Sequence, residues 1–106
     1  MNIKKTLRIY ARKCAYCGYI FQKFEEKTVD HIIPSSKISK GTKLTNLLVC
    51  CKSCNHQKAD KDLKDFITAK IKIHIKNYLQ SLNSIIINGQ NYSEEIQKVL
   101  YNIIGE

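Results

Sequence analysis

The sequence predicts a small α+β domain, and three local patterns carry this prediction. Two Cys-x-x-Cys pairs begin at Cys14 and Cys51. Between them, residues 28–32 form a short β-favouring run and residues 47–50 a short apolar one, and both favour strands. After them, apolar residues recur at three- and four-residue intervals, the period of amphipathic helices. With 106 residues, the chain fits one compact domain.

The four paired cysteines predict a structural zinc site. Cys14 and Cys17 have the same two-residue gap as Cys51 and Cys54. In a reducing compartment such pairs indicate metal rather than disulfides, and four thiolates suit tetrahedral zinc. We expect the metal to join the segment before the first strand to the segment after the last one. Cys50 breaks the spacing, so we predict a small buried hydrophobic residue there.

The N-terminal half predicts a helix followed by strands. Residues 3–13 place apolar and basic side chains on opposite sides at helical spacing, which indicates a short amphipathic helix or arm. Residues 19–21 and 28–32 favour strands, and Pro34 ends the second of them. Residues 35–45 contain Ser, Lys and Gly41 and few apolar residues, which is typical of a surface loop.

The C-terminal half predicts mainly helices. A buried strand at 47–50 leads into a helix that begins near Lys52, and residues 63–82 have the apolar period of one long amphipathic helix. The Asn-Gly pair at 88–89 indicates a turn, after which Ser93 can cap a last helix. The two long helices form a hairpin that packs either on the core or on a second copy of the chain, which would make a homodimer.

The charge distribution favours a nucleic-acid partner. The formal net charge is +9, with 17 basic and 6 acidic side chains in residues 1–84 against 1 and 3 in residues 85–106. A positive field around the cysteine core is typical of proteins that bind phosphate backbones, although lysine-rich surfaces also serve solubility. The candidate phosphate contacts are Arg8, Arg12, Lys13, Lys37, Lys40, Lys43 and Lys58.

The chain has no apolar run near the ~20 residues that a membrane helix needs, so we expect no membrane partner. The N-terminal residues include charges and no continuous apolar stretch, so we expect no cleaved signal peptide. These features predict a cytoplasmic protein.

One ordered set of motifs resembles the HNH endonuclease family. That family has a ββα-metal motif that runs as Asp-His-Ile-x-Pro, then Asn-Leu, then Cys-x-x-Cys followed by His or Asn and a Lys. The resemblance covers roughly residues 14–60. The corresponding residues here are Asp30-His31-Ile32-Ile33-Pro34, Asn46-Leu47, Cys51-Lys52-Ser53-Cys54-Asn55 and Lys58.

The resemblance implies a ββα-metal core and a division of the chain. Residues 1–62 would form the nuclease core with its zinc knuckles, and residues 63–106 a helical extension of the same domain. Its relatives imply a bacterial or phage-encoded protein.

The resemblance also implies a role for each site residue. His31 would be the general base that activates water, and Asp30 and Asn55 would hold one divalent cation. Asn46 would orient the loop or the imidazole. A hard cation that contacts a phosphate oxygen and the leaving oxygen offsets the charge that makes phosphodiester hydrolysis slow. The expected activity is therefore metal-dependent DNA hydrolysis.

The third position of the motif departs from the pattern of many members, because Asn55 stands where they have His. An amide oxygen is a harder ligand than imidazole, which favours Mg²⁺ or Mn²⁺. His56 is the neighbouring candidate, but one residue along a helix turns a side chain by about 100°. We therefore prefer Asn55. The alternative functions are a non-catalytic zinc-stapled nucleic-acid-binding module and a zinc-ribbon protein-interaction domain.

Overall fold

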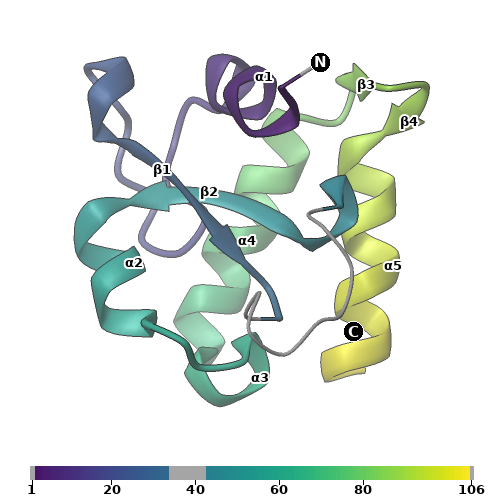
Figure 1. Cartoon of the computed structure of the whole chain (residues 1–106). Helices are drawn as coiled ribbons and strands as arrows, with labels where there is room; N and C mark the ends of the chain where they lie inside the picture. The colour runs from purple at the N-terminus through teal and green to yellow at the C-terminus, as the bar shows by residue number, and fades with distance from the viewer. Residues whose placement is uncertain (1, 34–42, 106) are drawn as a thin grey trace.

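In the computed structural model, which describes residues 2–33 and 43–105, helices surround a two-stranded antiparallel sheet (Figure 1). Its strands are β1 (Lys27–His31) and β2 (Leu47–Cys51), and α2 (Lys52–Lys58) follows β2 directly. The two strands and this helix form a ββα unit. The predicted α+β class is confirmed.

The two strands differ in burial. In β2, Leu47 to Cys50 are all 0% exposed, so this strand lies inside the core. In β1 only Asp30 is buried, and the other residues are half-buried. Successive strand side chains point to opposite faces. Thr28 and Asp30 therefore share one face of β1, and His31 points to the other.

The N-terminal segment forms the predicted helix but not the first predicted strand. α1 (Ile3–Tyr10) is capped by the Asn2 side chain, which accepts from the Lys5 amide at 3.0 Å. The prediction of a strand at 19–21 is wrong, because this stretch makes only an isolated bridge opposite Lys13. The Cys14 amide donates to the Tyr19 carbonyl at 2.8 Å and the Phe21 amide to the Arg12 carbonyl at 2.9 Å, so the backbone bonds of this stretch close the turn that holds the first cysteine pair. The short helix η1 (Phe24–Glu26) then leads into β1.

The prediction of one continuous helix over residues 63–82 is wrong, because the chain forms two helices there. α3 (Leu63–Phe66) ends before α4 (Ala69–Ser81) begins. The Thr68 side chain accepts from the Ile71 amide at 3.1 Å and so caps α4. The apolar period continues across the break because both helices bury residues in the same core.

The C-terminal turn is where the Asn-Gly pair predicts it. β3 (Ile86–Ile87) pairs with β4 (Gln90–Asn91), and Asn88 and Gly89 between them have φ of 52° and 76°. Both values lie in the left-handed region that Asn and Gly tolerate best.

The last helix begins earlier than its predicted cap. α5 (Tyr92–Ile104) is capped by Asn91, whose side chain accepts from the Glu94 amide at 3.0 Å. The prediction of Ser93 as the cap is wrong. Ser93 is buried within the first turn, where Gln97 donates to its hydroxyl.

The helices α4 and α5 pack on the core of the same chain. Tyr92 donates to the Leu47 carbonyl at 2.6 Å, and the Val49 amide donates to the Tyr78 hydroxyl at 3.1 Å. The two tyrosine hydroxyls lie 2.9 Å apart. Of the two predicted arrangements, the hairpin therefore packs on the core of its own chain. Most of the apolar side chains that a homodimer interface would need are already buried there.

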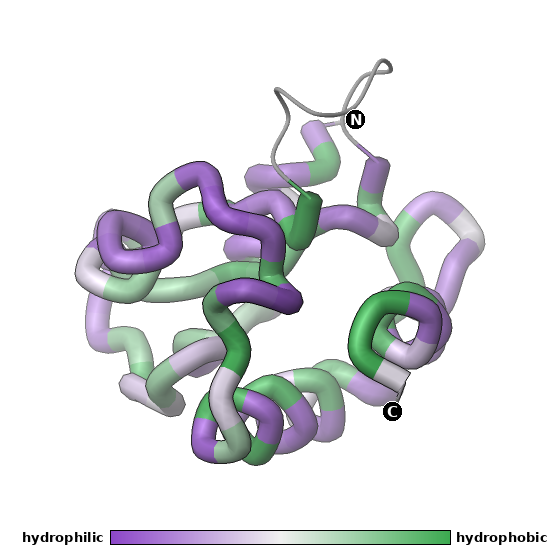
Figure 2. The backbone as a smooth tube through the Cα atoms, turned by 90° about the horizontal axis from the view of Figure 1, so that it is seen from below, coloured by the Kyte–Doolittle hydropathy of each residue, from purple (hydrophilic) through white to green (hydrophobic). Residues whose placement is uncertain are grey.

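The helix η3 (Leu44–Asn46) precedes β2 and contacts α5. The turns of α5 beside the C-terminus carry both hydrophobic and hydrophilic stretches (Figure 2). Within the described residues, no helix combines the length and apolarity that a membrane span requires.

The predicted division of the chain between residues 62 and 63 stays a prediction.

Candidate functional site

Four cysteine sulfurs converge at one end of the ββα unit. The Sγ atoms of Cys14, Cys17, Cys51 and Cys54 all lie within 4.8 Å of one another, and those of Cys17 and Cys51 are 3.9 Å apart. A tetrahedron with Zn–S bonds of ~2.3 Å has edges of about 3.8 Å. The four cysteines are therefore positioned to bind a metal ion, and they fit zinc.

Backbone amides stabilise two of these sulfurs. The Tyr16 amide donates to Cys14 Sγ and the Cys54 amide donates to Cys51 Sγ, each at 3.4 Å. Gly18 completes the first turn with φ of 79°, and a Cβ atom there would lie 2.8 Å from His74 Nδ1. Only glycine fits this position without strain, since both the backbone angle and the imidazole exclude a side chain.

Burial makes the cysteine cluster dependent on a cation. Burial raises the pKa of the Cys14 thiol to about 11, and it also raises the pKa of Cys54. Without a cation these thiols stay protonated at neutral pH, and a bound zinc ion would displace their protons. Cys50 is outside the cluster and fully buried, and burial raises its pKa as well. The predicted burial of Cys50 is therefore confirmed.

Asp30 is held in a buried ion pair. Its Oδ2 accepts from the Tyr16 hydroxyl at 2.5 Å and lies 3.0 Å from Lys58 Nζ. Burial and the Asp30 charge raise the pKa of Tyr16 well above its ordinary value, so its hydroxyl stays a donor. These two contacts fix one carboxylate oxygen and the orientation of the group.

Lys58 is a structural residue rather than a surface cation. Its side chain is 0% exposed, and Nζ also donates to the His31 carbonyl at 2.7 Å. The prediction that Lys58 contacts phosphate is therefore wrong. A buried ammonium requires a paired anion and hydrogen bonds, and Asp30 and His31 provide them from consecutive residues of β1.

We expect Lys58→Met to destabilise the domain by about 3 kcal/mol, because Asp30 would keep a buried charge without its cation. Urea unfolding followed by circular dichroism measures this change. The exposed Lys61, one turn further along the chain, provides the matched substitution Lys61→Met. Equal stability of the two variants would contradict a buried ion pair.

His31 follows Asp30 at the end of β1 and points to the other face of the strand. Its Nε2 is buried, and no hydrogen bond joins it to any described residue. Burial lowers the pKa of His31 below the ordinary imidazole range, and the charges of Lys4 and Lys58 lower it further against the opposing effect of Asp30. The ring is therefore neutral at pH 7 and can accept a proton.

Asn55 faces β1 from the helix α2. Its Nδ2 donates to Thr28 Oγ1 at 3.0 Å, and that hydroxyl donates to the Cys50 carbonyl at 2.8 Å. Because the one hydroxyl proton of Thr28 goes to Cys50, Thr28 can only accept from Asn55. The amide oxygen of Asn55 is thereby turned away from Thr28. His56, the neighbouring candidate, is exposed.

Asn46 fixes the chain where it leaves β1. Its Oδ1 accepts from the Ile33 amide, and its Nδ2 donates to the Ile33 carbonyl, both at 2.9 Å. The Ile32 amide donates to the Asn46 carbonyl at 2.8 Å. Asn46 thus holds the backbone just after His31.

Pro34, Lys37 and Lys40 lie outside the described residues.

Tyr16, Thr28 and the burial of Lys58 were missed by sequence reasoning. Tyr16 stands between Cys14 and Cys17, where an aromatic residue suggests only packing, and the centres of its ring and the Phe66 ring do lie 5.3 Å apart. One signal was available, because an aspartate within a β-favouring run needs a buried partner, and the lysine of the family motif could supply it.

The fold and the cysteine cluster together define a ββα domain with four cysteines positioned to bind a metal ion. Residues 14–61 match the model of the HNH endonuclease family. The resemblance predicted from the sequence is therefore confirmed for this segment.

A solved structure supports the same fold. The chain is similar to the Type II-C Cas9 enzyme from Actinomyces naeslundii, with a TM-score of 0.58 and 19% identity. The match covers 92% of this chain and 10% of the Cas9 chain, so the chain spans about a tenth of that enzyme. The search of the curated proteins found no match.

Proposed function

We propose that the protein is a metal-dependent DNA endonuclease. One observation carries the proposal: β1 presents Asp30 to α2, the helix that carries Asn55, and the adjacent His31 has a neutral imidazole with an unbonded nitrogen. The family of residues 14–61 supports nuclease chemistry. The net charge of +9 supports a polyanionic substrate.

Asp30 and Asn55 are the residues we assign to a catalytic cation. Tyr16 and Lys58 occupy Oδ2 of Asp30, so Oδ1 is the oxygen assigned to metal. The Asn55 amide nitrogen donates to Thr28, so the Asn55 amide oxygen is the second oxygen assigned to the metal. Two oxygen donors with open positions fit Mg²⁺ or Mn²⁺. When bound, such a cation would offset the charge that develops on the phosphate and on the leaving oxygen.

His31 is assigned the general-base role, because its lowered pKa keeps the imidazole neutral at neutral pH and a neutral imidazole can accept a proton. Asn46 is assigned a positioning role, because it holds the backbone of Ile33 two residues after His31. Lys58 adds to this positioning through the His31 carbonyl. Water activated by His31 would leave a 5′-phosphate and a 3′-hydroxyl.

Supercoiled plasmid incubated with the zinc-loaded protein and Mg²⁺ tests the proposal. We expect nicked and linear DNA with Mg²⁺ or Mn²⁺ and none in a buffer without added divalent cation. Asn55→Ala should lower the rate at low Mg²⁺ more than at high Mg²⁺, because it removes a metal ligand. Asn77→Ala, at an exposed position of α4, is the matched control. Equal Mg²⁺ dependence of the two variants would remove Asn55 from the metal site.

The alternative is a non-catalytic zinc-stapled nucleic-acid-binding module. The same cysteine cluster and positive charge support it. It predicts that the zinc-loaded protein binds DNA and never nicks it at any Mg²⁺ or Mn²⁺ concentration.

A further inference from the structure

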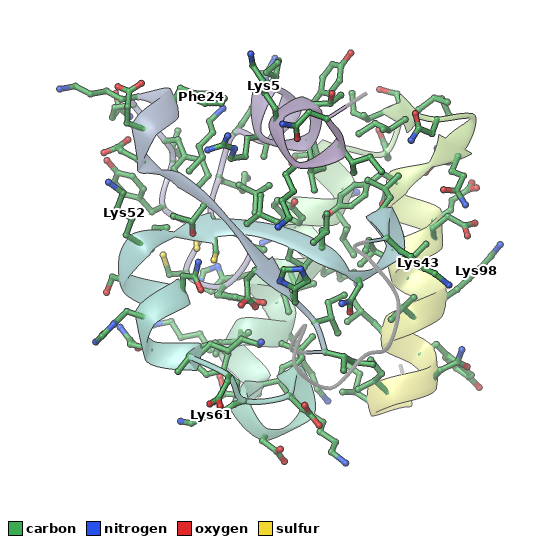
Figure 3. The ribbon with its side chains drawn as sticks, viewed as in Figure 1. Lys5, Phe24, Lys43, Lys52, Lys61 and Lys98 are labelled. Atoms are coloured by element: carbon green, nitrogen blue, oxygen red, sulfur yellow. The ribbon has the colours of Figure 1, made fainter. Side chains whose placement is uncertain are left out.

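The helix α1 carries basic side chains beside His31, outside the segment that matches the family. Its residues include Lys4, Lys5 and Arg8 and no acidic residue. Leu7 is 0% exposed and fixes the inner face of the helix, whereas Lys4 and Lys5 are exposed. Lys5 projects outward from α1 in Figure 3.

Contacts with β1 fix the direction of this helix. The Arg8 carbonyl accepts from Lys27 Nζ at 2.8 Å, so Arg8 lies at the start of β1. The Arg8 guanidinium also stacks 4.6 Å from the centre of the Phe24 ring. Lys4 lies one helical turn earlier and is close enough to His31, the last residue of β1, for its charge to act on the imidazole. Arg8 and Lys4 therefore form a row along β1 that leads to His31.

Two unsatisfied nitrogens lie along the same row. Within the described part of the chain, the buried side-chain nitrogens without a hydrogen-bond partner are Arg8 Nε and His31 Nε2. Buried polar atoms are normally hydrogen-bonded, so the Arg8 guanidinium keeps a donor that no described residue uses, and guanidinium groups bind phosphate strongly. The nearby Glu26 carboxylate is already engaged, because it accepts from the Tyr19 hydroxyl and from the amides of Gln22 and Lys23.

We propose that α1 binds one strand of a DNA duplex, with Lys4 and Arg8 contacting successive phosphates next to His31. Side chains four residues apart on a helix have Cβ atoms about 5–6 Å apart, so these two long side chains reach neighbouring phosphates. The proposal rests on the proposed nuclease function only in that the bound strand would be the substrate of that nuclease. These contacts would recognise the phosphate backbone and not the base sequence.

Duplex binding by the double variant Lys4→Gln/Arg8→Gln tests this surface. The probe is a fluorescently labelled DNA duplex, measured by anisotropy against zinc-loaded protein in a magnesium-free buffer at several salt concentrations. Loss of two phosphate contacts should weaken binding by about tenfold or more and lower the salt-dependence slope by about 1.8. The control Lys61→Gln/Lys98→Gln loses the same charge at the positions labelled away from α1 in Figure 3. It should bind as the wild type does.

The outcomes separate this proposal from the nuclease function. Wild-type-like affinity and salt slope in the α1 variant would overturn the α1 surface, even if the protein cleaves plasmid. Failure of the wild type to cleave, with the affinity still lost in the α1 variant, would support the surface and reject the nuclease. An affinity loss confined to a labelled RNA duplex would overturn the assignment to DNA. Thermal unfolding of both double variants shows whether the fold is intact.

Discussion

Replacing His31 with alanine is expected to lower the rate of plasmid cleavage by a factor between about 10² and 10⁴, the usual contribution of a positioned general base. The substitution removes the imidazole but keeps the backbone carbonyl that accepts from Lys58. Since Nε2 has no partner among the described residues, its loss breaks no side-chain hydrogen bond there. Initial rates of plasmid nicking in Mg²⁺ measure the effect, and duplex affinity should stay unchanged.

His56→Ala is the matched control for this substitution. His56 stands beside Asn55 in the sequence but is exposed on α2 and has no assigned role. Its loss should leave the nicking rate within about twofold of the wild type, the range of an ordinary surface substitution. Full activity in His31→Ala would rule out His31 as the base. A large loss in His56→Ala would move the site to the other side of α2.

The sequence predicts those features whose signal is local. The cysteine spacing predicts the four-sulfur cluster, and the β-branched runs predict β1 and β2 to within one residue. The break between α3 and α4 also had a local signal, because Thr68 is a good N-cap. It was hidden by an apolar period that continues across two separate helices.

The remaining features depend on tertiary contacts that no spacing encodes. Lysine is almost never fully buried, so the sequence predicts a surface role for Lys58. The structure buries it because Asp30 faces α2 on the same side of β1 as Thr28. The choice of Asn91 over Ser93 as a helix cap was likewise decided by the β3–β4 hairpin, which places Asn91 at the start of α5.

Removal of zinc is expected to unfold the domain rather than only inactivate it. Structural zinc contributes on the order of 10 kcal/mol to the folding of zinc-finger peptides, and whole domains are stable by about 5–15 kcal/mol. Here the metal would join Cys14 and Cys17, which precede β1, to Cys51 and Cys54, which follow β2. Thermal unfolding by circular dichroism after chelation should lose its cooperative transition, and added Zn²⁺ should restore it.

Two cysteine variants show whether stability depends on the bound metal or only on a buried thiol. Cys54→Ser should purify with little zinc, measured by elemental analysis, and should lack the cooperative transition. Cys50→Ala removes a buried thiol outside the cluster and should keep full zinc with a cost of about 1 kcal/mol. Because Asn55 directly follows Cys54 and Tyr16 lies between Cys14 and Cys17, the same metal would also hold Asn55 and the Tyr16 donor of Asp30 in place. Mg²⁺ should therefore restore neither folding nor cleavage to the zinc-free protein, and rescue by Mg²⁺ alone would contradict two separate metal sites.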